Sequence, residues 1–138
     1  MFKFVHHVHY VVADVDAVVR YMEESFDMKP DHQEDVEDGG YKEALYSAGQ
    51  TLIEFTQPTK EGTGLSDFLV THGPGVYHVA WGVDNIEERA GELAAKGRKL
   101  RGEGGHHERP GIQNHQHRAL GFSGFLVPVG GGVGHANL

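Results

Sequence analysis

A pattern that occurs twice in the chain limits its fold more than any other sequence feature. Residues 7–12 (HVHYVV) and 78–83 (HVAWGV) have the β-branched and aromatic composition of strands, and an aspartate that can cap a helix closely follows each segment. His7 and His78 hold the same place in these two strand–helix units. Such a duplication implies pseudo-twofold symmetry, which brings equivalent residues together near the axis.

The rest of the pattern extends each unit to a strand, a helix and further strands. In the first half we expect a strand at 4–12, a helix from Asp14 that Pro30 ends, a loop or frayed strand at 31–38, and a hairpin of 41–47 with 51–56. In the second half we expect a short helix capped by Ser66, a strand at 76–83, a helix with a capping box of Asp84 and Glu87 that closes at Gly97, and closing strands at 121–127 and 133–138.

The predicted fold class is therefore α+β. Two tandem βαβββ modules form a curved mixed sheet around a cleft, with module one at about 1–58 and module two at about 74–138. Both modules belong to a single domain at 1–138, because a chain of this length fits one ordinary domain.

Glu54 is unusual for a strand residue because apolar side chains flank it. Strand alternation turns Ile53 and Phe55 away from the face of Glu54. A buried, unpaired carboxylate costs stability, and a metal ion would remove that cost. Together with the two equivalent histidines, His7 and His78, Glu54 forms a ligand set that suits Zn²⁺, Fe²⁺, Co²⁺, Ni²⁺ or Mn²⁺. The sequence thus predicts a divalent-metal cleft.

Composition argues against several classes of function. The chain has no cysteine, which excludes disulfides and thiolate metal sites. The formal net charge is −8, whereas nucleic-acid binding needs a concentrated basic surface. No apolar run approaches the about 20 residues of a membrane helix, and the N-terminal segment lacks the apolar core of a signal peptide. We therefore expect a cytoplasmic protein with neither nucleic acid nor membrane as its partner.

Three segments together resemble the vicinal-oxygen-chelate superfamily, which includes glyoxalase I, extradiol dioxygenases and bleomycin-resistance proteins. They are HHVHYVVADVDAVVRYMEESFDM, TLIEFTQP and GPGVYHVAWGVDNIEERAGELAAKGRKL. Among the members of this superfamily the chain resembles the methylmalonyl-CoA epimerases in particular, especially over residues 73–100. The resemblance implies two tandem βαβββ modules, a bound divalent metal ion and a homodimer. It covers most of the chain but is weak over residues 102–117.

The resemblance also assigns roles to individual residues. His7, Glu54 and His78 match the first three metal ligands of the superfamily. Glu37 or Asp38 lies where the epimerases carry a catalytic glutamate, and Glu54 becomes a second candidate for proton transfer if it swings off the metal.

The chain departs from the superfamily at its end. Where relatives finish with a glutamate that is the fourth ligand, this chain has Ala136 or Asn137, depending on one gap. His135 is the one strong ligand nearby, so His135, Asn137, and a water or substrate oxygen are alternative fourth ligands.

Three functions follow from the resemblance. The first is a metal-dependent isomerase, epimerase or lyase that removes a proton next to a metal-chelated carbonyl. The substrate expected for it is a small molecule such as an acyl-CoA or a thiol adduct. The second is a non-haem Fe(II) dioxygenase with a two-histidine, one-carboxylate site. The third is a non-catalytic binding or resistance protein.

Overall fold

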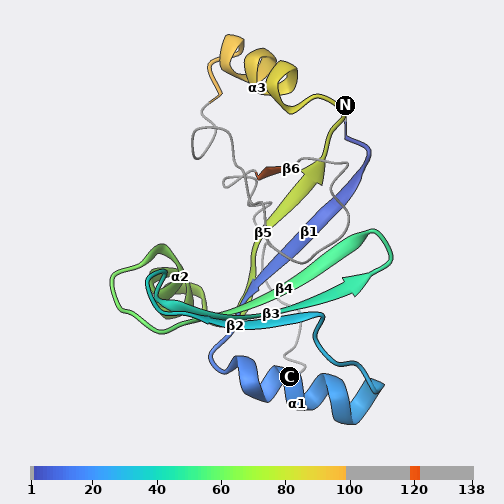
Figure 1. The fold of residues 1–138 in the computed structure, drawn as a ribbon. Coiled ribbons are helices and arrows are strands. Elements are labelled where there is room, and N and C mark those ends of the chain that lie inside the picture. The colour runs from blue at the N-terminus through green and yellow to red at the C-terminus, as the bar shows by residue number, and fades with distance from the viewer. Residues whose placement is uncertain (1, 99–118, 122–138) are drawn as a thin grey trace, which may run out of the picture.

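The computed structural model describes residues 2–98 and 119–121 (Figure 1). In chain order the elements are β1 (Phe4–Val11), α1 (Val15–Phe26), β2 (His32–Val36), β3 (Tyr41–Ala48), β4 (Thr51–Pro58), α2 (Gly64–His72), β5 (Gly75–Gly82), α3 (Ile86–Ala95) and β6 (Ala119–Gly121).

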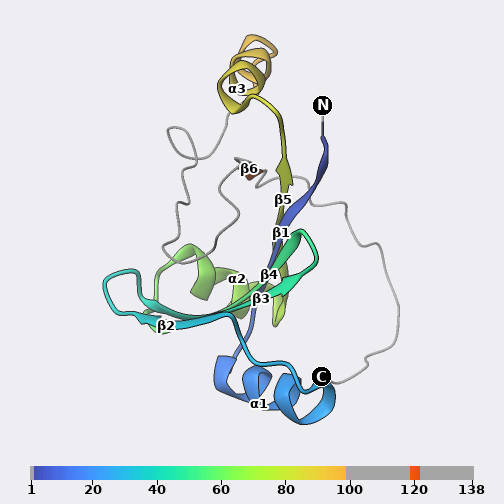
Figure 2. The ribbon, with the colours of Figure 1, turned by 45° about the vertical axis from the view of Figure 1, so that its right-hand side comes forward.

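The strands form one mixed sheet in the order β2-β3-β4-β1-β5-β6. β1 runs parallel to β4, and every other neighbouring pair is antiparallel. β1, α1, β2, β3 and β4 make up a complete βαβββ module, while β5, α3 and β6 begin a second one. The sheet is strongly bent between β1 and β3, and α1 and α3 lie at opposite ends of the molecule (Figures 1 and 2). The prediction of an α+β fold with a curved mixed sheet is confirmed; its division into modules and a single domain stays a prediction.

The equivalent strands β1 and β5 are direct neighbours at the centre of this sheet. They run antiparallel, as a pseudo-twofold axis between them requires. The first strand of the chain is thus an interior strand, with β4 on its other side. This position explains why residues of β1 can contact side chains of both halves.

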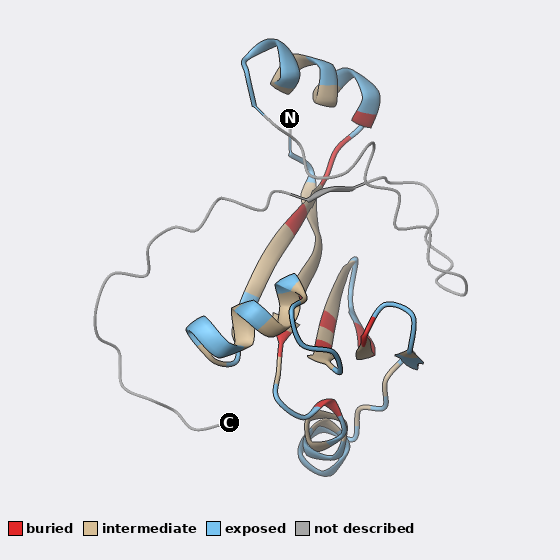
Figure 3. Ribbon diagram, turned by 90° about the vertical axis from the view of Figure 1, so that its left-hand side faces the viewer, coloured by how far each residue is buried: buried red, intermediate tan, exposed pale blue. Residues whose placement is uncertain are grey.

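Helix α1 covers one face of the first module. Asp14 caps the helix, since its side chain accepts a hydrogen bond from the backbone N–H of Ala17 at 2.9 Å. The helix ends at Phe26, before Pro30, because Asp27 adopts a left-handed φ of 54°. The core under the helix consists of Val12, Val15, Val19, Met22, Met28, Ala44, Tyr46, Ile53 and Phe55. Most buried residues lie in the strands, and the helices are largely exposed (Figure 3).

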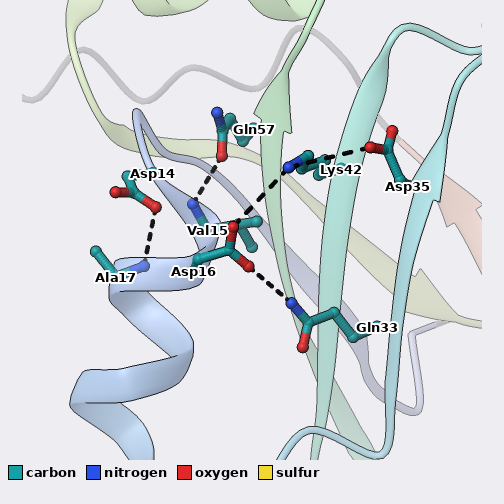
Figure 4. Close-up of polar contacts among 8 residues, drawn as sticks. All are labelled: Asp14, Val15, Asp16, Ala17, Gln33, Asp35, Lys42 and Gln57. Atoms are coloured by element: carbon teal, nitrogen blue, oxygen red, sulfur yellow. Dashed lines mark hydrogen bonds and ion pairs between the residues drawn. The ribbon is translucent and has the colours of Figure 1, made fainter.

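Polar contacts hold the first turn of α1 on the sheet (Figure 4). The backbone N–H of Val15 donates to Oε1 of Gln57 at 3.0 Å, and the amide of Gln33 donates to Asp16 at 3.0 Å. Lys42 lies 3.9 Å from the same Asp16 carboxylate. The exposed ion pair of Lys42 with Asp16 contributes about 1 kcal/mol or less, whereas the hydrogen bond from Val15 to Gln57 is partly buried. These contacts nevertheless fix which face α1 covers, and the opposite face remains for a site.

Two predicted helix caps are wrong. Thr63 caps α2, since its side chain accepts from the N–H of Ser66, which is the third residue of a capping box and not the cap. Asn85 caps α3 in place of Asp84, and its side chain accepts from the N–H of Glu88 at 3.1 Å. Adjacent residues that both carry a capping oxygen cannot be told apart by sequence.

Other boundaries sharpen the predictions. The acidic segment at 31–38 does contain a strand, β2, at the edge of the sheet. Gly97 follows α3 with a φ of 71°, as predicted for a residue that closes a helix. The predicted strand at 121–127 overlaps β6 at Gly121, and the strand predicted at 133–138 lies outside the described residues. None of the helices in residues 2–98 combines the length and apolar character needed to cross a bilayer.

Candidate metal and proton-transfer site

The structure brings His7 and His78 together from the two equivalent strands. Their Nε2 atoms lie 3.1 Å apart, and the ring planes are inclined at 70°. Two imidazole nitrogens that bind one ion at 2.0–2.1 Å are themselves separated by about 3 Å. The pair therefore already has the spacing of two ligands of one metal ion.

The protonation state of His7 also suits a ligand. Burial lowers its pKa from 6.5 to about 3, an effect that the nearby charge of Glu54 opposes and the histidines around it reinforce. The ring is consequently neutral near pH 7, and metal binding needs a neutral imidazole.

A β-bulge precedes each of the two histidines. The register between β1 and β5 shifts at His6 in one strand and at Tyr77 in the other. Neighbouring residues of a regular strand point to opposite faces, but a bulge re-aims side chains. Nδ1 of His6 accordingly lies 2.9 Å from Nδ1 of His7. A His7 tautomer that donates from Nδ1 to His6 leaves its Nε2 lone pair directed at His78.

Glu54 lies on the same face and is only 6% exposed. In the sheet it pairs with His9 of β1 and Leu45 of β3, whereas Ile53 and Phe55 face α1. The hydroxyl of Thr56 donates to Oε1 of Glu54 at 3.5 Å. Because Glu54 shifts the pKa of His7, its carboxylate acts on the histidine pair electrostatically. As the alternation in the sequence predicted, Glu54 lies on one face of the sheet and Ile53 and Phe55 lie on the other.

Within residues 2–98 and 119–121, one group of three ligand atoms lies within 4.8 Å of one another, and it is a different one. It consists of His32, Glu34 and Glu43 on strands β2 and β3. His7, His78 and Glu54 do not meet this distance criterion. The carboxylate of Glu54 acts on His7 electrostatically, but it does not form a compact three-atom group with the two imidazole nitrogens. The donor set nevertheless fits a borderline divalent ion, because it joins neutral imidazoles at ligand spacing to a buried carboxylate.

Two buried residues on this face had no predicted role. His9, which is 7% exposed, lies with its ring 4.9 Å from that of His78. Glu43, which is 4% exposed, pairs across the sheet with Glu34 and Thr56. Strand alternation in the sequence could have identified His9, because a residue two positions after His7 lies on the same face of the strand as His7. Glu43 needed the β3–β4 register as well, because it shares a face with Glu54 only if the hairpin turns at Gly49.

Glu37 and Asp38 lie in the turn between β2 and β3, and both are exposed. Next to this turn Tyr41 pairs with Pro58, whereas Glu54 pairs with Leu45 near the middle of the hairpin. The structure thus does not bring either residue to the histidine pair, and a catalytic role for them stays a prediction. His135, Ala136 and Asn137 lie outside the described residues.

Comparison with known proteins identifies the family. A model of the glyoxalase/bleomycin resistance protein/dioxygenase superfamily matches residues 6–114. The chain belongs to this superfamily. The match includes both histidines of the converged pair and all of the first module except the start of β1. It agrees with the resemblance inferred from the three sequence segments.

Several solved structures share the fold of this chain. Methylmalonyl-CoA epimerase from Mycobacterium tuberculosis is 27% identical, with 74% of this chain and 69% of that chain covered and a TM-score of 0.65. A protein of unassigned function from Bacillus halodurans is 28% identical over 72% of each chain, with a TM-score of 0.64. A methylmalonyl-CoA epimerase solved with methylmalonyl-CoA and ammonium is 21% identical, covers 80% of this chain and 81% of its own, and has a TM-score of 0.68. No curated protein sequence matches the chain significantly.

Proposed function

We propose that this protein is a metal-dependent epimerase or isomerase, which moves a proton next to the carbonyl of an acyl thioester. The observation that carries the proposal is the convergence of His7 and His78 at 3.1 Å on a face that also buries Glu54 and Glu43. The superfamily fold and the 27% identity to an epimerase support the choice of reaction. A homodimer and an acyl-CoA substrate belong to the same proposal.

Three side chains would hold the ion: His7, His78 and Glu54. When bound, a divalent metal acts as a Lewis acid that stabilises negative charge on a substrate oxygen. Glu54 would add one negative charge to this ligand set, and burial on the inner face would keep water away from it. The fourth ligand stays open between His135, Asn137 and a substrate or water oxygen.

Glu43 is our proposed base. It would take the proton from the carbon next to the carbonyl, while the electron pair of that C–H bond moves into the enolate. A solvent proton delivered to the opposite side of the same carbon would complete epimerisation, and Glu43 would then lose its proton to solvent. Glu43 is 4% exposed and lies on the face that also buries Glu54. For this reason we favour Glu43 over the exposed Glu37 and Asp38, and over Glu54, which is assigned to the metal.

Proton exchange tests this proposal directly. Untagged protein stripped with a chelator and reloaded with Zn²⁺, Co²⁺ or Mn²⁺ should incorporate one deuterium from D₂O into 2-methylmalonyl-CoA, as followed by mass spectrometry. Glu43→Gln should slow the exchange by about 10²–10⁴-fold, the usual contribution of a general base. If the double variant E37Q/D38N loses exchange and Glu43→Gln retains it, the base lies in the β2–β3 turn.

Further substrates separate the remaining alternatives. Exchange into a hemithioacetal but not into methylmalonyl-CoA would assign a glyoxalase-like lyase. Oxygen uptake by Fe²⁺-loaded protein with a catechol would assign a dioxygenase, which needs the same two histidines and one carboxylate. Absence of every reaction in metal-loaded protein would contradict the proposal and favour a binding protein.

A further inference from the structure

His9 is the middle member of a row of side chains that crosses three strands. It pairs with Glu54 of β4 on one side and with His78 of β5 on the other. Directly paired residues point to the same face of a sheet. His9 thus lies between two of the three proposed metal ligands, on the face where they meet.

The side chain of His9 contacts both of these neighbours. Its Nε2 lies 3.8 Å from Oε1 of Glu54, and its ring meets that of His78 edge-on, with centroids 4.9 Å apart and an interplanar angle of 82°. The ring of Tyr77, which the bulge in β5 turns toward this face, packs edge-on against His9 at 5.3 Å. Enclosed in this way, the imidazole keeps Nε2 directed at the carboxylate.

Two roles are open to His9: a third imidazole ligand, or a residue that orients a ligand. Among the described residues neither His9 nor Glu54 completes, with His7 and His78, a group of three ligand atoms within 4.8 Å of one another. Of the two, Glu54 is the proposed ligand because it supplies a negative charge, and Nε2 of His9 lies 3.8 Å from its Oε1. This arrangement is that of a residue that orients ligands, which metal sites commonly place behind carboxylates and histidines.

We infer that His9 is a positioning residue, whose imidazole lies against the carboxylate of Glu54 and holds it in place while its ring limits rotation of His78. The inference rests on the proposed metal site and extends it to a residue outside the ligand set. It predicts that His9 raises metal affinity through Glu54, without a bond of its own to the ion.

Metal titration of chelator-treated protein tests this role, with Co²⁺ absorption as a second readout. His9→Ala should weaken Co²⁺ binding about 10- to 100-fold and change the visible spectrum. His9→Gln should restore most of the affinity, because its amide N–H occupies about the position of the imidazole Nε2. In an E54A background, His9→Ala should lower the affinity less than it does in the wild type, since only its contact with the ring of His78 remains.

His72→Ala is the matched control. It removes another imidazole, one that stacks on Phe68 at the exposed end of α2, and should leave the affinity unchanged. Equal affinities of wild type and His9→Ala would overturn the inference and leave the proposed site intact, as would a His9→Gln variant no better than His9→Ala. Wild-type protein that binds no metal ion would overturn both.

Discussion

The two faces of the first module bury different chemistry. The face under α1 is filled by aliphatic and aromatic side chains such as Val15, Ile53 and Phe55. The opposite face buries Glu43 and Glu54 along the same strands, together with His9 of β1, and His7 beside them is half-buried. Both faces thus contain buried side chains. Burial of apolar surface stabilises mainly the face under α1, because the opposite face buries charged and polar groups.

The apolar face stabilises the fold, and the polar face is the one to which we assign the proposed site. Burial of apolar surface stabilises by about 25 cal/mol per Å², whereas burial of a carboxylate costs free energy unless partners compensate it. Strands β3 and β4 carry both kinds of residue in strict alternation, so a small cost on one face is offset by the other. Substitutions on the α1 face should therefore change stability, and those on the opposite face should change ligand binding.

The largest expected effect is on the α1 face. Tyr46 is 1% exposed, and its ring meets Phe55 edge-on at 6.0 Å. Tyr46→Ala should lower the free energy of unfolding by about 3–5 kcal/mol, because it opens a cavity that the core cannot fill. Urea denaturation monitored by circular dichroism measures the loss. A loss below about 1 kcal/mol would mean that this face is not the main core.

The next effect is on the opposite face. His7→Ala should weaken metal binding at least about 100-fold, which corresponds to about 2.7 kcal/mol, since it removes one of two converged nitrogens. Isothermal titration of chelator-treated protein measures it. His32→Ala is the comparison variant, because His32 belongs to the separate group with Glu34 and Glu43. Loss of binding in His32→Ala, but not in His7→Ala, would move the metal to the β2–β3 edge.

Sequence alone predicted the elements that depend on local patterns. Asp14 caps α1 because a capping oxygen precedes an apolar 3.6-residue period, and Gly97 follows α3 because it tolerates a left-handed φ. The internal repeat predicted that His7 and His78 approach each other, and they do so at 3.1 Å. Their role as ligands, with that of Glu54, stays a prediction.

What the sequence did not predict depends on pairing between strands. The bulges at His6 and Tyr77 exist only in the register of β1 against β5, so the rotation of these two side chains toward the site had no local signal. His9 gains its neighbours only because β1 lies between β4 and β5. Glu43 likewise shares the face of Glu54 through the β3–β4 register.

A smaller effect is a pH dependence of stability in the metal-free protein. Folding lowers the pKa of His7 from 6.5 to about 3, so between these values the unfolded chain binds more protons than the folded one. The free energy of unfolding should therefore fall as the pH is lowered from about 6.5 toward 3, by up to about 1.4 kcal/mol per pH unit from this group. The difference between wild type and His7→Phe, measured by urea denaturation at several pH values, isolates the contribution. Parallel curves for the two proteins would contradict a neutral, buried His7.

The smallest expected effect comes from changing one polar group on each face of the sheet. The hydroxyl of Tyr46 is buried on the α1 side and has no hydrogen-bond partner among residues 2–98 and 119–121. Tyr46→Phe removes this group and keeps the ring, so the free energy of unfolding should change by about 0.5 kcal/mol or less, or rise slightly. A loss above about 1 kcal/mol would reveal a partner for the hydroxyl and a polar site on the α1 face.

The matched change on the opposite face, Glu54→Gln, also alters only one polar group in a buried side chain. It should leave the fold intact but weaken metal binding, because a carboxylamide is a poorer ligand than a carboxylate for a divalent ion.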